Sequence, residues 1–346
     1  MSEQNRNTTR LRLKQDEVDI INEYRGLKQV AEQSGVHIDD VKHAWLKSDN
    51  ASLFVKNPNF QSAKRNQFVE DLIKELDNYS PKYPEIKREK SKAGHLMVLD
   101  PADIHIGKLC TRLETGQEYN SQIAVKRVLK GVRGVLKSSN GFDIDKINFI
   151  AGNDILHIDT PHRKTTSGTP QDTDGMWYEN FLMAKKLYVD VLEILLSIAD
   201  VHFTFNPSNH DYISGFMLSQ TIESHFRHCK NISFDTGIAH RKYFTYHNNL
   251  IGTTHGDGAK IGDLPNLMAH ESKDWSNCKK RYFYTHHVHH KTSKDFIGCT
   301  VESLRSPSTA DSWHHRNGYT GAVEGVEAFI HHKQYGQIAR LTHIFE

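Results

Sequence analysis

Short apolar runs recur along the last two thirds of the chain, and each run stops at a polar residue. The runs lie at 95–99, 146–151, 201–205, 249–253 and 282–284. Runs of this length that are rich in β-branched and aromatic residues predict buried strands. Between the second and third runs, residues 177–199 place apolar side chains at helical spacing and predict a crossover helix. This alternation indicates an α/β fold.

A cluster of polar residues follows each predicted strand. The clusters are Asp103-Ile104-His105, Gly152-Asn153-Asp154, Ser208-Asn209-His210-Asp211, Thr254-His255-Gly256-Asp257 and His286-His287-Val288-His289. They offer carboxylate, amide and imidazole ligands, which hard to borderline divalent ions prefer, and no thiolate. A single Asp or Asn after a strand more often caps a turn or a helix, and a lone His is more often a hydrogen-bonded surface group. Five such clusters in this order, each after a strand, predict a metal site at one edge of the fold.

Two divalent ions at one site have a specific chemical use. About 3.5–4 Å apart, they acidify a shared water and clamp the phosphoryl group that this water attacks. One carboxylate bridges such a pair, while imidazoles and an amide fill the other positions and leave the centre positively charged. The clusters therefore predict a phosphoesterase with two divalent ions as cofactors. Manganese is expected, and iron, zinc and magnesium are the alternatives.

From about Leu96 to the C-terminus, these clusters resemble the calcineurin-like metallophosphoesterase superfamily. Its pattern runs Asp-x-His, Gly-Asp, Gly-Asn-His-Asp/Glu, His and Gly-His-x-His. The resemblance implies a metallophosphoesterase-type αββα sandwich of the α/β class. The implied ligands are Asp103, His105 and His289 for the first metal, Asn209, His255 and His287 for the second, and the bridging Asp154 for both.

The resemblance also implies three catalytic residues. His210 would be the catalytic histidine that binds no metal, and Asp211 would orient it. The run Asp154-Ile155-Leu156-His157 is similar to the Asp-x-x-His of SbcD-type DNA repair nucleases, in which the extra histidine helps to handle a diester. A similar arrangement is found in phage-encoded phosphoesterases, and a phage origin is inferred by this analogy.

Three positions depart from the superfamily pattern. Asn153 separates Gly152 from the aspartate, Ser208 replaces a glycine, and His286 replaces another. Each change affects a turn residue rather than a ligand. Asn tolerates a positive φ, so the first change is compatible with a tight turn.

The first 79 residues predict a small helical module. Residues 27–46 resemble a helix-turn-helix, with Gly35 at the turn. Lys42, His43 and Lys47 are the candidate DNA contacts of its second helix, although acidic neighbours in that helix oppose phosphate binding. The alternative is a small helical bundle used for protein contact. Residues 61–79 predict an amphipathic helix.

The remaining chain divides into a linker and a catalytic domain. Residues 80–94, with two prolines and dense Lys and Glu, predict an exposed linker, and residues 95–346 the catalytic domain. The polar loop 160–175 follows the bridging aspartate, and its Arg163 and Lys164 are candidate substrate contacts. The alternative for this loop is a solvated surface segment. The paired histidines 314–315 and 331–332 are interpreted as surface or strand residues outside the site.

Composition limits the partners and the compartment. The 44 Lys plus Arg nearly balance the 42 Asp plus Glu, so any nucleic-acid contact must be local. The four cysteines are scattered, which argues against a disulfide scaffold or a zinc finger. The chain shows no signal core and no run long enough to span a bilayer. We therefore expect no membrane association and a cytoplasmic location, that of the host if the protein is phage-encoded. The sequence leaves the oligomeric state open, with a homo-oligomer as one alternative.

Taken together, the patterns predict a two-metal-dependent phosphodiesterase, specifically a DNA nuclease that cleaves with a hydroxide shared by the ions. A phosphomonoesterase of the same fold, acting on proteins or small molecules, is the alternative enzyme. A non-catalytic DNA-binding protein is the alternative of another class, although the full ligand set argues against it. The sequence leaves three choices open: whether the substrate is a diester or a monoester, whether it is DNA or RNA, and whether the enzyme acts as an exonuclease or an endonuclease.

Overall fold

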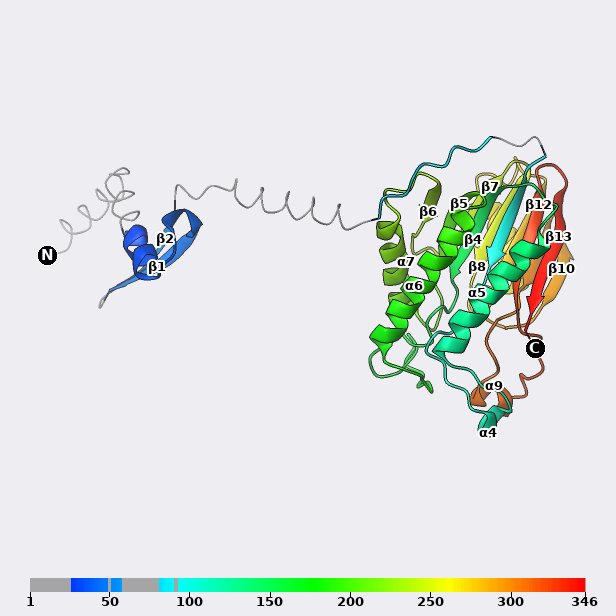
Figure 1. The fold of residues 1–346 in the computed structure, drawn as a ribbon, viewed down its shortest axis with the longest axis horizontal. Helices are drawn as coiled ribbons and strands as arrows, with labels where there is room; N and C mark the ends of the chain where they lie inside the picture. Colours follow the sequence, from blue (N-terminus) through cyan, green and yellow to red (C-terminus); the bar gives the residue numbers. More distant parts are fainter. Residues whose placement is uncertain (1–25, 49–50, 58–80, 90–92, 346) are drawn as a thin grey trace. The chain divides into compact units, whose positions relative to one another are not determined.

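The computed structural model describes residues 26–48, 51–57, 81–89 and 93–345 (Figure 1). The chain divides into two compact units, Met1–Tyr79 and Ser80–Glu346. The predicted amphipathic helix at 61–79 lies outside the described residues.

The smaller unit contains a β-hairpin where the sequence predicts a second helix. A helix over 26–33 leads through a turn to the short 3-10 helix η1 (Ile38–Asp40). Strand β1 (His43–Ser48) then pairs antiparallel with β2 (Ala51–Lys56). The helix-turn-helix prediction is corrected here, because its second helix is replaced by a turn and two strands.

Side-chain chemistry explains the hairpin. Trp45 lies directly opposite Phe54, with ring centroids 5.2 Å apart, and aromatic cross-strand pairs stabilise antiparallel strands. The Asn57 amide donates hydrogen bonds to the carbonyl oxygens of Ile38 and Val41, which ties the end of β2 to η1. These contacts between strands outweigh the helical periodicity of the predicted second helix.

The larger unit contains two sheets. The first has six strands in the order β13-β12-β3-β4-β5-β6 and the second five in the order β10-β11-β9-β8-β7. The first consists of β3 (His95–Asp100), β4 (Ile144–Gly152), β5 (Asp200–Asn206), β6 (Ile232–Asp235), β12 (Gly325–His332) and β13 (Gly336–Ile344). The second consists of β7 (Lys242–Tyr246), β8 (Asn249–Thr254), β9 (Lys280–Thr285), β10 (Thr292–Phe296) and β11 (Cys299–Ser303). Strands β3 to β6 are parallel, as are β8, β9 and β11.

Helices cover the outer faces of both sheets. Helices α5 (Ser121–Ser138), α6 (Trp177–Leu196) and α7 (Tyr212–His225) pack on the six-stranded sheet (Figure 1). Helix α8 (Leu264–Glu271) lies on the five-stranded sheet, and the 3-10 helix η2 (Ile261–Asp263) contacts α8. Short helices α4 (Arg112–Thr115) and α9 (Ser312–Arg316) contact each other at one end. The predicted αββα sandwich is confirmed.

Strand β3 shows why its run is apolar throughout. Leu96 and Val98 join the core between the two sheets, while Met97 and Leu99 join the core beneath the helices. A parallel strand buried on both faces needs apolar residues at every position. Among the described residues, no helix has both the length and the apolar character that crossing a bilayer requires.

Within the larger unit, the segment 81–89 has no helix or strand and packs on the residues at the ends of α6 and α7. Tyr83 stacks on Phe226 and donates a hydrogen bond to Glu193. The Ile86 amide donates to the Asn231 side chain. Within residues 81–89 of the predicted linker, most side chains are therefore exposed, and the segment is anchored at intervals.

Arg340 joins the two sheets, and its removal is expected to destabilise the fold. Its guanidinium donates to Glu302 on β11 and to the fully buried Glu327 on β12. Although burial opposes ionisation, Arg340 and Arg305 hold the pKa of Glu327 below its usual value. Removing one partner of a buried ion pair typically costs about 3–5 kcal/mol. We expect Arg340→Met to lower the free energy of unfolding by about that amount at pH 7.

Denaturant titration checks this expectation, with the exposed Arg133→Met on α5 as the control. Because the pKa of Glu327 is depressed, the stabilisation is present above its unfolded pKa and is lost as the pH falls through the folded value. The difference between wild type and Arg340→Met should therefore shrink in acid. Equal stability of the two proteins at pH 7 would contradict the proposed tie.

Candidate metal centre

The loops that carry the predicted ligands have an unusual backbone. Among the described residues, eight non-glycine residues have a positive φ, and six of them lie in the predicted clusters. These six are Asp103, His105, Asn153, Asp154, His287 and His289. Asp, Asn and His are the residues that tolerate this region best, yet each such position costs on the order of 1–3 kcal/mol. Clustering of strained residues at one place indicates a functional site.

The predicted ligands of the first metal lie together at the ends of β3 and β9. Nε2 of His105 is 3.3 Å from Nε2 of His289, and the latter atom is 3.6 Å from a carboxylate oxygen of Asp103. Asp103 and His105 are buried, and His289 is partly exposed. One carboxylate oxygen and two imidazole nitrogens thus face a common point.

The predicted ligands of the second metal form a neighbouring group. Nε2 of His255 lies 3.2 Å from a carboxylate oxygen of Asp154 and 2.9 Å from the amide oxygen of Asn209. His287 completes the group. The backbone N–H of His287 donates to the carboxylate of Asp103, so the two groups are directly connected. All seven predicted ligands are brought together, although metal binding itself stays a prediction.

The electrostatics of this region suit cations. Although burial alone would lower it, the carboxylates of Asp154 and Asp103 raise the pKa of His255 to about 9. Burial holds the pKa values of His105 and His289 well below the usual range, so both imidazoles are neutral. Burial and the nearby Asp154 raise the pKa of Asp103 to about 6.

These properties provide a test of fit. Metal ligands must be deprotonated. A proton on Nε2 of His255 lies between this nitrogen and two oxygens, those of Asp154 and Asn209, and a cation in the same place would bind all three atoms. The donors are carboxylate, amide and imidazole groups, which suit hard to borderline divalent ions. The residues therefore fit a pair of divalent cations.

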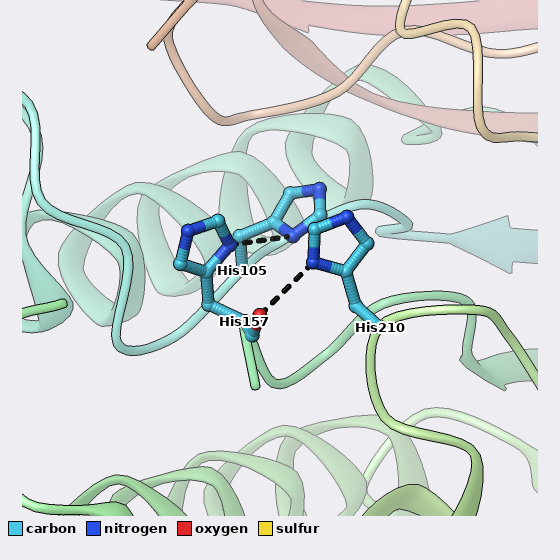
Figure 2. Close-up of side chains that lie close together, drawn as sticks. All are labelled: His105, His157 and His210. Carbon is cyan, nitrogen blue, oxygen red and sulfur yellow. Dashed lines mark hydrogen bonds between the residues drawn. The ribbon is translucent and has the colours of Figure 1, made fainter. Parts of the chain in front are cut away.

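Three histidines form a compact group beside this centre, shown in Figure 2. Nδ1 of His157 is 3.3 Å from Nδ1 of His105. Nδ1 of His210 donates to the carbonyl oxygen of His157 at 2.9 Å. The second ring nitrogens of His105 and His210 point to the same side, whereas that of His157 points away (Figure 2). His210 therefore presents Nε2 toward the ligand groups, and His157 supports the other two rings.

Asp211 has a different role from the one predicted. The sequence assigns it the orientation of His210, but that ring is oriented by the carbonyl oxygen of His157. The buried Asp211 carboxylate accepts hydrogen bonds from Ser208 Oγ at 2.6 Å and from the Leu156 amide at 2.9 Å. Burial and Asp154 raise its pKa to about 7. Asp211 thus joins the loop after β5 to the loop after β4.

Residues that the sequence did not single out support the predicted ligands of the first metal. The His314 ring stacks on His289, with centroids 5.2 Å apart. Nδ1 of His314 is 2.6 Å from Asp311, which also pairs at 3.2 Å with the fully buried Lys108. The only sequence signal for this arrangement is that Asp311 suits the start of a helix. The earlier interpretation of His314 as a surface histidine is corrected.

A second buried pair explains one departure from the superfamily pattern. His286, in place of a glycine, is fully enclosed, with Nε2 2.8 Å from Asp100 and Nδ1 3.0 Å from the carbonyl oxygen of Thr254. These contacts link the end of β3 to the loops after β8 and β9. His286 thus positions the segment that carries His287.

The predicted substrate contacts belong to the larger unit, and the predicted DNA contacts belong to the smaller one. Arg163 and Lys164 are exposed on the loop after β4, and Arg163 has a positive φ. In the smaller unit, Lys42 precedes β1 and is exposed, while His43 and Lys47 belong to β1. The candidate DNA contacts therefore lie on a hairpin and not on a recognition helix.

The position of His157 yields a specific prediction. A histidine that accepts the Nδ1–H of a ligand histidine fixes its tautomer, and loss of such partners typically costs 10–100-fold in metal affinity. We expect His157→Ala to weaken binding of one of the two ions by roughly that factor. Metal titration followed by elemental analysis measures this. His228→Ala, a change on the surface after α7, is the control. Unchanged affinity for both ions would instead favour direct contact of His157 with a substrate.

No protein-family model matches the chain, and no curated protein does. Solved structures that match include a conserved uncharacterized protein (predicted phosphoesterase) from Streptococcus pneumoniae TIGR4, 13% identical over 73% of this chain and 98% of that one, with a TM-score of 0.31. Wild-type Vps29 complexed with Zn²⁺ from Entamoeba histolytica is 12% identical over 72% and 99%, with a TM-score of 0.31. A novel archaeal phosphodiesterase is 8% identical over 72% and 99%, with a TM-score of 0.35. At such low identity, function is inferred from the site residues.

Proposed function

We propose that this protein is a two-metal-dependent phosphodiesterase and that its substrate is DNA. The observation that carries the proposal is the convergence of seven ligand-type side chains from five segments. These segments span residues 103 to 289, and their donor atoms form two connected groups. Structural ion pairs alone do not explain why four imidazoles gather around two buried carboxylates.

The residues divide into two sets of ligands. Asp103, His105 and His289 would hold one divalent ion, and Asn209, His255 and His287 the other, with Asp154 contributing to both. When bound, such ions activate a water and neutralise charge on the phosphoryl oxygens. Manganese is the metal we propose.

We assign to His210 the protonation of the leaving group. Its backbone N–H donates to Asp154 at 3.0 Å, and its Nδ1–H donates to the carbonyl oxygen of His157. These two bonds fix the ring so that Nε2 can hold a proton for the departing alkoxide. His210 is only partly buried, so a substrate can reach it.

A phosphomonoesterase of the same fold is the second candidate. The sequence motif connects His157 with diester cleavage, but this side chain is 2% exposed and contacts His105 and His210 rather than the open side of the site. A residue in that position supports the centre for both substrate classes, whether the phosphate carries one ester group or two.

One assay separates these candidates. Purified full-length protein with manganese is tested on bis-p-nitrophenyl phosphate, p-nitrophenyl phosphate, and linear and circular DNA. We expect the diester and DNA to be cleaved and the monoester to be the poorer substrate. Faster monoester than diester hydrolysis, with intact DNA, would favour the phosphatase. No hydrolysis of any substrate by protein that contains two ions would contradict an enzymatic function.

A further inference from the structure

Trp313 on helix α9 and Tyr319 just after this helix form a pair of exposed aromatic side chains beside the candidate metal centre. The rings of Trp313 and Tyr319 are stacked, with centroids 5.7 Å apart and an angle of 25° between planes. Trp313 is 60% exposed and Tyr319 63% exposed. The last turn of α9 is basic, and its Arg316 is exposed. We call Trp313 and Tyr319 the aromatic platform.

The local sequence builds this platform through the end of α9. The Tyr319 amide donates to the His314 carbonyl oxygen, and the Gly318 amide donates to that of His315. These are the two bonds of a Schellman motif, which needs a residue with positive φ, and Gly318 has a φ of +80°. The motif brings Tyr319 back over the helix onto Trp313. A contact of this kind ordinarily closes a helix, but here more than half of each side chain stays open to solvent.

The platform is attached to the metal centre by buried groups. Asp311 begins α9, accepting the His314 amide at 3.0 Å, and pairs with Lys108, which follows the ligand His105 by three residues. Lys108 also donates to the Thr309 carbonyl oxygen at 2.7 Å. His314 contacts the ligand His289 on one side and Trp313 on the other, each with centroids 5.2 Å apart. One ring therefore separates the platform from the centre.

We propose that the aromatic platform binds an unpaired base of a single-stranded nucleic acid whose phosphate lies at the metal centre. This inference rests on the proposed function. Exposed aromatic rings next to a basic segment are the means by which proteins hold single strands, because every base can stack and the backbone is anionic. In a duplex the bases are already stacked on each other, so the platform favours single strands or frayed ends. Base stacking is common to DNA and RNA.

The test compares Trp313→Ala with wild type in the full-length, manganese-loaded protein. Substrates are single-stranded DNA and RNA oligonucleotides, a duplex, an abasic strand with the same phosphates, and bis-p-nitrophenyl phosphate. Base stacking on one aromatic residue predicts roughly a 5- to 100-fold rise in KM for single strands. The loss on the small diester should be much smaller. Wild type should bind the abasic strand about as weakly as Trp313→Ala binds the normal strand.

Three controls make the result specific. Trp313→Phe should restore most of the affinity, because the ring is retained. Gly318→Ala, at a position with φ of +80° and open space around it, should weaken single-strand binding without removing either ring. Tyr335→Ala removes an aromatic residue that is 65% exposed on the β12–β13 turn, and it should leave all substrates unaffected.

The outcomes separate this proposal from the broader one. Equal KM values of wild type and Trp313→Ala for single strands, with the small diester still cleaved, would overturn the platform and leave the phosphodiesterase intact. Equal losses on duplex, abasic and normal strands would also overturn it, since they indicate phosphate binding. A wild-type dimer that becomes a monomer in Trp313→Ala would show that a second copy covers the rings. Failure to cleave the small diester would instead contradict the proposed function.

Discussion

Asp154→Asn is expected to reduce manganese-dependent hydrolysis of bis-p-nitrophenyl phosphate by at least about 10³-fold. A pair of divalent ions contributes several kcal/mol to the transition state, and each 1.36 kcal/mol is a factor of ten in rate. Asp154 is buried, faces His255 at 3.2 Å and accepts the His210 amide at 3.0 Å. A carboxamide at this position keeps the size of the side chain but removes the charge that two cations would share. Among ligand substitutions, this one should have the largest effect.

Initial rates and elemental analysis check the prediction together. Chelation of the wild type should abolish turnover, and added manganese should restore it. Asp190→Asn changes a partly exposed carboxylate on α6 that pairs with Lys186, and this matched control should behave as wild type. Full turnover by chelated protein, or an Asp154→Asn enzyme within tenfold of wild type, would refute the two-metal assignment.

His210→Ala is expected to retain both ions and yet lose about 10²–10⁴-fold in turnover on nucleotide esters, the usual value of general-acid catalysis. Nitrophenyl esters should lose far less, because their leaving group needs little protonation. The distinction arises because Nδ1 of His210 is committed to the His157 carbonyl oxygen, which leaves Nε2 for the substrate.

The comparison of kcat on the two ester classes measures this effect. His240→Ala serves as the control, because His240 stacks on Tyr212, the residue that follows the loop containing His210. Equal and small losses on both esters would mean that His210 only fills its loop. Equal and large losses, with fewer than two ions bound, would indicate collapse of the Asn209 loop.

Strands β3, β4, β5, β8 and β9 of the larger unit were predictable because each contains a short apolar run, and β3 is buried on both faces. Leu96 to Leu99 show this directly, since alternate residues enter different cores. The smaller unit was not predictable in the same way. Its helical spacing at 36–46 competes with the Trp45–Phe54 pairing, which depends on a partner strand that periodicity within one segment does not reveal.

The candidate ligands were identifiable because each sits directly after a strand, so chain order and residue type contain the information. Asn153 illustrates this: a residue that tolerates positive φ stands where the turn has a φ of +51°.

By itself, the sequence determined the α/β class and the set of ligand-type residues, because both depend on residue type and short-range spacing, whereas the αββα arrangement was implied by the resemblance of its motifs. The tertiary structure decided which side chains support them. His314 stacks on His289, Lys108 reaches Asp311, and the His157 carbonyl oxygen rather than Asp211 orients His210. These contacts join residues that are distant in sequence, and they depend on side-chain directions in irregular loops that no periodic pattern encodes.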